Sequence, residues 1–286
     1  MTGWKWKSVL FAVVLCALGS ARGQTLSVSP QGDDVAFTWS GVASNTVYAL
    51  EAADDLAAPN WNRIPAFERA ALPETSHVFS PVAGQGAQYF RLEAIDRGEL
   101  LSSGPLTELS ALALTFLQSQ VGIIDPVLHG ADVHFITYRT VDGRGREVTA
   151  SAAVAVPTGG LPGPYPLMSW QHGTVAETNN APSVVGSNQW VPASVMAGQG
   201  FISVAPDFVG LGIAANQLHP YLHAEASANA VVDALRATRQ CVAGLPQTEN
   251  GKVFLAGYSQ GGQATMAAIR QIERDYVVEF ELTASA

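Results

Sequence analysis

The sequence predicts an α/β protein in which a small antiparallel β-sandwich-like domain precedes an incomplete, mostly parallel sheet with helices on both faces. Before residue 97, apolar and polar residues alternate with a period of two, which is typical of strands with one buried face. From residue 125, short apolar runs alternate with stretches of helical periodicity, which favours a sheet covered by helices. Hydrophobic residues make up 48% of the 286 residues and charged residues only 14%, so the chain can build a sizeable core.

The first 23 residues carry the pattern of a secretory signal peptide. Lys5 and Lys7 precede an apolar run over residues 9–18, and residues 21–23 form a small-x-small cleavage site. The apolar run is shorter than the roughly 20 residues that a membrane-spanning helix needs. We therefore expect export, to the periplasm or outside the cell, with cleavage before Gln24.

Residues 24–97 are expected to form the small sandwich, and their pattern resembles fibronectin-like modules of exported bacterial proteins. Val35 and Phe37 alternate with small or polar neighbours, and the same alternation occurs over residues 89–94. Further strands are expected at residues 48–52 and 76–79. Three aromatic residues could form a platform for stacking on sugars, although aromatic side chains at alternating strand positions more often belong to the core. These are Trp39, Trp61 and Tyr89.

Charge and cysteine content exclude several functions. Lys and Arg number 15 against 24 Asp and Glu, giving a net charge of −9, and the basic residues are not clustered. Nucleic-acid binding is therefore not expected. Cys16 and Cys241 are the only cysteines, which excludes a disulfide framework and a thiolate zinc site. Cys241 is expected to be a buried core residue.

Residues 98–124 are expected to be a linker that ends in a helix, because Leu109, Leu112 and Phe116 recur at helical spacing. Residues 125–286 then contain the α/β part. Its first two strands should form a hairpin around the turn at residues 142–145. A helix is expected over residues 222–240 and another after Ser259. The expected strands cover residues 133–140, 147–157, 165–170, 201–205, 252–256 and 280–283.

The string GYSQG at residues 257–261 directly follows one of these strands and opens a helix. This is the setting of a nucleophile elbow, in which a serine is held on a strained turn between a strand and a helix. Glycine is required because a side chain at Gly257 or Gly261 would collide with neighbouring backbone. Ser259 is therefore the expected nucleophile, exposed at the rim of the sheet. The positive end of the helix dipole would favour an anion developing there.

The string QHGT at residues 171–174 follows a predicted central strand. Hydrolases with a nucleophile elbow take one oxyanion donor from such a loop and the other from the residue after the nucleophile. We therefore expect the backbone amides of Thr174 and Gln260 to form the oxyanion hole, with Val175 as the alternative to Thr174. His172 is expected to hydrogen-bond within its loop so that the Thr174 amide points inward, rather than to act in catalysis.

Three further polar residues are weighed as site candidates. Asp207 follows a predicted strand and could be a triad acid, but an acid before the glycines that follow is more often a turn former. His219 and His223 have the i, i+4 spacing of metal ligands. No carboxylate or third histidine completes that pattern, so a surface or helix-start role is favoured. No metal or organic cofactor is expected.

Four strings carry a resemblance to a known family. They are SWQHGT at 169–174, APDFVGLG at 205–212, DALRATRQ at 233–240 and GYSQGG at 257–262. With them, the chain from about residue 133 resembles the N-terminal part of an α/β-hydrolase, most similar to secreted bacterial and fungal lipases and esterases. GYSQG is also the pentapeptide of cutinase-like esterases, which favours ester over peptide hydrolysis. Serine peptidases of the prolyl oligopeptidase group share the fold, so that alternative stays open.

The resemblance implies a triad in the order Ser, then Asp or Glu, then His. All six histidines precede Ser259, and the sequence after it has room for only one helix and the start of one strand before Ala286. We therefore expect a C-terminally truncated chain that lacks the triad acid and histidine and is inactive alone. The strand near residue 280 would be left as a bare sheet edge, which favours aggregation.

The expected function is that of a secreted serine hydrolase of carboxylic esters, acting through Ser259 and a backbone oxyanion hole. The alternatives are a fragment of a prolyl-oligopeptidase-like peptidase and a non-catalytic secreted binding protein. The expected partners are a small-molecule or lipid ester substrate and, through the N-terminal domain, a polysaccharide or surface. Acyl-chain length and oligomeric state leave no mark in the sequence.

Overall fold

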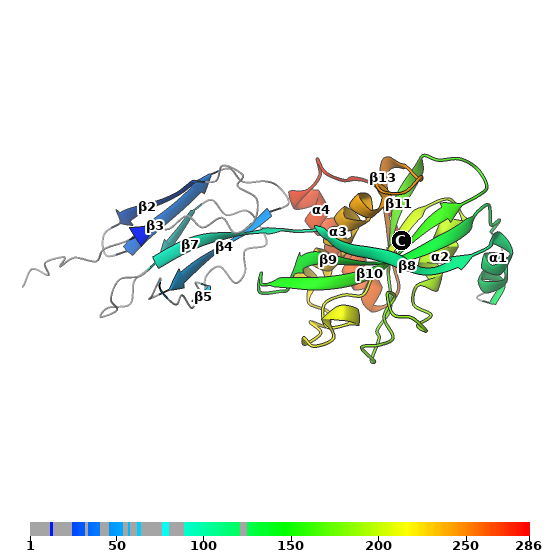
Figure 1. The fold of residues 1–286 in the computed structure, drawn as a ribbon, viewed down its shortest axis with the longest axis horizontal. Helices are drawn as coiled ribbons and strands as arrows, with labels where there is room; N and C mark the ends of the chain where they lie inside the picture. Colours follow the sequence, from blue (N-terminus) through cyan, green and yellow to red (C-terminus); the bar gives the residue numbers. More distant parts are fainter. Residues whose placement is uncertain are drawn as a thin grey trace, which may run out of the picture. The chain divides into compact units, whose positions relative to one another are not determined.

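The computed structural model describes residues 12–13, 25–31, 34–40, 46–53, 57, 62–63, 76–79, 89–120 and 125–286. The chain divides into two compact units, Met1–Asp96 and Arg97–Ala286 (Figure 1). Apart from residues 12–13, the expected signal peptide lies outside the described residues. The side chain of Trp39 and the whole of Trp61, two members of the expected aromatic platform, lie outside them as well.

The first unit contains two sheets. One has the order β1-β7-β4-β5, from β1 (Ala12–Val13), β7 (Tyr89–Asp96), β4 (Thr46–Ala53) and β5 (Asn62–Arg63). The other has the order β2-β3-β6, from β2 (Thr25–Gln31), β3 (Asp34–Ser40) and β6 (Ser76–Phe79). All pairs except the parallel pair β1–β7 are antiparallel. Phe37 is fully buried, as the period-two pattern predicts for the apolar face of its strand, whereas Ile95 is also fully buried although it follows Tyr89, Arg91 and Glu93 on the face expected to be polar.

The second unit is built on a mixed sheet with the order β14-β13-β11-β12-β10-β9-β8 (Figure 1). Its strands are β8 (Leu100–Leu109), β9 (Gly130–Val141), β10 (Glu147–Thr158), β11 (Tyr165–Gln171), β12 (Ile202–Pro206), β13 (Glu249–Gly257) and β14 (Glu281–Ser285). Strands β12, β11, β13 and β14 are mutually parallel, whereas β8, β9 and β10 form an antiparallel meander that joins β12 through β10. The expected hairpin and the expected sheet with parallel strands are confirmed, and the sheet is mixed, with three parallel and three antiparallel strand pairs.

Strand β10 shows that helices cover both faces of this sheet. Ala152 and Val154 belong to a core cluster that includes residues of α3 (Ala224–Val242) and α4 (Gln260–Asp275). Ala153 and Ala155 belong to another, with Leu114 of α1 (Ala111–Gln120) and Ala197 of α2 (Val191–Gly198). Because successive strand side chains point to opposite faces, α3 and α4 cover one face and α1 and α2 the other.

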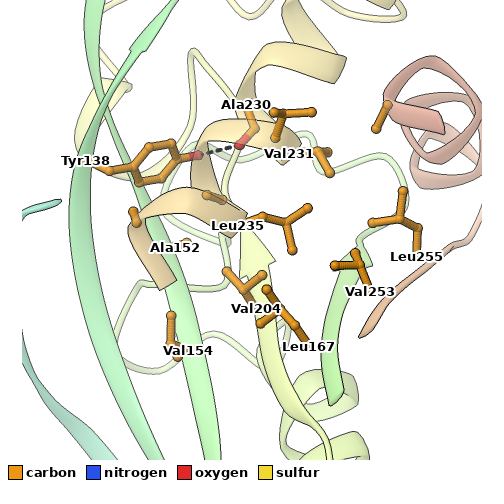
Figure 2. Packing of buried hydrophobic residues seen from close by; sticks show 14 of the residues in the cluster. Tyr138, Ala152, Val154, Leu167, Val204, Ala230, Val231, Leu235, Val253 and Leu255 are labelled. Carbon is orange, nitrogen blue, oxygen red and sulfur yellow. Dashed lines mark hydrogen bonds between the residues drawn. The ribbon is translucent and has the colours of Figure 1, made fainter. Parts of the chain in front are cut away.

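The small-residue face of α3 lets this helix approach the sheet closely. Ala230 and Ala234 are fully buried, and the Tyr138 hydroxyl of β9 donates to the Ala230 carbonyl over 3.0 Å (Figure 2). Cys241, near the end of α3, is a free and buried thiol in the same core, as expected. Among the described residues, none of the helices combines the length and the apolar character needed to cross a membrane.

The expectation of a linker over residues 98–124 is wrong in its first part. Residues 100–109 are strand β8, which pairs with β9 at the edge of the sheet, and only then does the expected helix α1 begin. The sequence does not indicate this strand because Gly104 and Pro105 interrupt its apolar pattern. Its pairing with β9 also shifts register twice. An edge strand tolerates proline because one side of the strand faces solvent, where a backbone N–H is not needed to pair with a neighbouring strand. Helix α2 was not expected either, since its two turns contain no charged residue to mark an outer face.

Candidate active site

Ser259 lies between β13 and α4 in a conformation that serine rarely adopts. Its backbone has φ 57° and ψ −115°, and its side chain is exposed. A Cβ added at Gly261 would overlap the Gln171 carbonyl, and one added at Gly257 would overlap the backbone of Gly261. The turn therefore holds its shape through close backbone contacts that only glycine permits.

The end of β11 lies against this turn. The Tyr258 amide donates to the Gln171 carbonyl over 3.2 Å, and a Cβ built on Gly173 would lie 3.8 Å from the Cβ of Ser259. This contact brings the loop that carries Thr174 beside the serine. Within the described residues, neither the Thr174 amide nor the Gln260 amide donates to a backbone or side-chain acceptor. Gln260 is also the first residue of α4, where the helix leaves N–H groups free and its dipole is positive.

His172 is buried and forms a hydrogen bond within its own loop, as expected. Its Nδ1 lies 2.7 Å from the Gly173 carbonyl and its Nε2 lies 3.3 Å from the Asp207 carbonyl. A neutral imidazole can donate to only one of these two oxygens, and the shorter contact favours a proton on Nδ1. Burial lowers the pKa of His172 and outweighs the two carbonyl contacts, which raise it.

This lowered pKa predicts a pH dependence of stability. The unfolded chain binds a proton at His172 below about pH 6.5, while the folded protein resists protonation until a lower pH. Stability from His172 is therefore complete above about pH 6.5 and is lost as the pH falls toward the folded pKa. We expect the difference in unfolding free energy between the wild type and His172→Gln to shrink from about pH 8 to about pH 5. Urea unfolding at both pH values measures it, and a constant or growing difference contradicts the expectation.

Asp207 is a buried carboxylate that holds its own loop together. It accepts from the Ser151 hydroxyl over 2.5 Å, from the Ser183 amide over 2.8 Å and from the Ser183 hydroxyl. Burial raises the pKa of Asp207, although these hydrogen bonds lower it in part. Both carboxylate oxygens are occupied by serine donors, which fits the expected turn role and not that of a triad acid.

His219 and His223 have separate local partners. His223 is the N-cap of α3, where its Nδ1 accepts from the Ala226 amide over 3.2 Å. The helix-start role expected for it is confirmed. His219 Nε2 contacts Gln260 Nε2 at 2.8 Å, a pairing that the sequence did not indicate because the two residues are 41 positions apart. Throughout the described ranges, no group of three or more His, Cys, Asp or Glu is placed to hold a metal ion.

The arrangement offers an exposed serine hydroxyl and free amides, and among the described residues no histidine is in hydrogen-bond contact with the serine. Tyr221 was also missed by the sequence reasoning: its hydroxyl lies 3.0 Å from the Thr174 hydroxyl, which links the loop before α3 to the loop after β11. No local pattern marks such a tyrosine, so only the fold reveals it.

The mixed sheet, its helices on both faces and a serine at positive φ between strand and helix are the features of an α/β-hydrolase fold in the second unit. Comparisons with known proteins agree. The family model described as secretory lipase matches residues 188–286. The resemblance to lipases and esterases, read first from the GYSQGG string, is thereby confirmed.

Two solved structures show the relationship. The rice cell wall degrading esterase LipA from Xanthomonas oryzae, in a ligand-bound form, is 36% identical with a TM-score of 0.59, over 66% of this chain and 49% of that one. A putative hydrolase from Legionella pneumophila is 28% identical with a TM-score of 0.60, over 65% of this chain and 50% of that one. The chain thus spans about half the length of these structures. The comparison with curated proteins gives no match.

Proposed function

We propose that this protein is a serine hydrolase of carboxylic esters in which Ser259 is the nucleophile. The observation that carries the proposal is the exposed Ser259 at φ 57°, between β13 and the start of α4. A serine forced into this conformation projects from the sheet rim, and such strain concentrates at functional sites. The amides of Thr174 and Gln260, which have no protein acceptor within the described residues, are proposed to bind the oxyanion.

The proposed reaction forms and breaks ordinary acyl bonds. Ser259 Oγ would attack the ester carbonyl carbon while a general base takes the hydroxyl proton, and the carbonyl oxygen would become the oxyanion. Collapse of this intermediate would release the alcohol, which receives the proton, and water would then hydrolyse the acyl-enzyme. We propose that a histidine and an acid placed after Ser259 in the full gene product complete this relay. The order Ser, acid, His in α/β-hydrolases supports this placement.

An apolar rim supports an ester with a hydrophobic acyl or alcohol part. Tyr258 is 73% exposed beside the serine, and Tyr221 and Leu222 are 52% and 48% exposed. Tyr221 contacts Thr174 through its hydroxyl, and the Leu222 carbonyl accepts from the side-chain Nε2 of Gln263 on α4 over 3.4 Å. These contacts fix exposed apolar side chains near the elbow, where they can contact substrate.

Similarity supports the ester class and export. The relative from Xanthomonas oryzae is described as a cell wall degrading esterase, and the matching family is described as secretory. We propose that this chain likewise acts on esters outside the cytoplasm, after removal of the N-terminal segment. Measuring p-nitrophenyl ester and p-nitroanilide cleavage side by side distinguishes this proposal from the peptidase alternative.

The decisive experiment uses the full gene product that contains these residues and a fluorophosphonate probe. We expect the wild type to be labelled and Ser259→Ala to be unlabelled, with ester turnover reduced at least about 10³-fold. The matched control is Ser119→Ala, which removes an exposed hydroxyl on α1 and should leave labelling and turnover unchanged. Absence of labelling in the folded wild type, or persistent labelling of Ser259→Ala, contradicts the proposal.

A further inference from the structure

The side chain of the residue that carries one proposed oxyanion amide is paired with a partly buried histidine. Gln260 is only 2% exposed, and its Nε2 contacts His219 Nε2 at 2.8 Å. The Oε1 of the same amide is buried without a hydrogen-bond partner. His219 is therefore the side chain that fixes the orientation of the Gln260 side chain.

The contact at Nδ1 of His219 determines which ring nitrogen carries the proton. His219 Nδ1 lies 2.6 Å from the Val209 carbonyl, which can only accept, so Nδ1 carries the proton. Nε2 of His219 then carries a lone pair, which accepts a hydrogen bond from the side-chain Nε2 of Gln260. Turning this amide over would place Oε1 against that lone pair, which is repulsive. The Val209 carbonyl thereby determines, through His219, which way the Gln260 side chain faces.

The second proposed oxyanion donor is tied to the same short segment. His172, two residues before Thr174, has Nε2 3.3 Å from the Asp207 carbonyl, but with the proton on Nδ1 this contact is not a hydrogen bond. Between the Asp207 and Val209 carbonyls lies Phe208, whose backbone has φ 67°. Its ring centroid is 4.7 Å from the ring of His172 and 6.4 Å from the ring of His219. Residues 207–209 thus contact both histidines through two carbonyls and one ring.

We infer that His219, held by the Val209 carbonyl just after the end of β12, is a positioning residue that acts on one half of the oxyanion hole through Gln260. The inference rests on the proposed function of Ser259 and deepens it. A positive-φ phenylalanine is costly, and it precedes the Val209 carbonyl, which accepts from His219 Nδ1. The imidazole of His219 then holds the side chain of Gln260, whose backbone carries a proposed oxyanion amide.

Three variants of the full gene product test the role of His219 with a p-nitrophenyl ester. His219→Phe keeps the ring against Phe208 but removes both hydrogen bonds, and we expect kcat to fall about 10- to 100-fold with KM changed less than about threefold. His219→Gln keeps an acceptor and a donor and should recover most of the loss. Gln260→Met keeps the backbone amide and should lower kcat like His219→Phe. The double variant should be no slower than either single variant, because both remove one interaction.

The controls separate this inference from the proposed function. His134→Phe changes a partly buried histidine on β9 and should leave kcat unchanged, and thermal unfolding checks that each variant folds. If Ser259→Ala abolishes turnover while folded His219→Phe keeps kcat within about twofold, the positioning role is overturned and the proposed function stands. Additive losses in the double variant also overturn it. If His219→Phe does not fold, an unchanged kcat in Gln260→Met overturns it. Turnover by Ser259→Ala refutes the proposed function itself.

Discussion

Asp233→Asn is expected to lower the free energy of unfolding by about 3–5 kcal/mol, because it leaves buried arginines without their central counter-charge. Asp233 is completely buried on α3 and lies 3.0 Å from Arg97 Nε and 2.8 Å from Arg236 NH1. It also accepts from the Thr140 hydroxyl over 2.6 Å. Asparagine has nearly the same volume, so the loss measures charge and hydrogen bonding rather than a cavity. Urea unfolding followed by circular dichroism measures it.

An exposed ion pair provides the matched control. Glu99 lies 2.9 Å from Arg139, but their side chains are 47% and 28% exposed, and Arg139 also pairs with Glu147. Glu99→Gln should therefore cost less than about 1 kcal/mol. Equal losses in Asp233→Asn and Glu99→Gln would show that the buried cluster has no special weight in the stability of this unit.

Replacing Gly261 by alanine is expected to disrupt the elbow and to lower the free energy of unfolding by about 3 kcal/mol. The new Cβ would overlap the carbonyl of Gln171, and the carbonyl of His172 lies 2.8 Å from the same position. Both contacts are backbone atoms of the loop that leads to Thr174, so neither can move without displacing the proposed oxyanion donor. Fluorophosphonate labelling should be lost together with stability.

The neighbouring glycine gives the control for this second variant. A Cβ on Gly262 would meet only the Gly257 carbonyl, at an ordinary contact distance of 3.6 Å. Because Gly262 lies within α4 and alanine favours helices, Gly262→Ala should be neutral or stabilising by up to about 1 kcal/mol. A Gly261→Ala protein as stable as Gly262→Ala contradicts the close backbone contact at the elbow.

Strands and helices with strong apolar periodicity were predictable from the sequence. Strands β9 to β13 and helices α3 and α4 fall where runs of apolar residues and turn residues placed them. The strained turn was predictable too, because glycines two residues before and after Ser259 are a local signature. Strand β8 was not, since its serines, glycine and proline imitate a linker and only pairing with β9 makes it a strand.

Arg97 shows most clearly what local pattern could not provide. In the sequence it ends the expected small domain, yet it belongs to the second unit and is 1% exposed, paired with a carboxylate 136 positions away. An arginine beside a strand is ordinarily solvated, so nothing in its neighbourhood indicates burial. Its burial depends on Asp233, Asn229 and Tyr276 converging from elements distant in the chain.

The sequence by itself determined the α/β class and the place of the serine turn, because periodicity and glycine sterics act between near neighbours. It also predicted the oxyanion donors, the backbone amides of Gln260 and of Thr174, with Val175 as the alternative to Thr174. Only the tertiary structure decided that residues 207–209 contact both His172 and His219, and that His219 faces Gln260. A histidine has many possible partners, and packing between distant segments selects one of them.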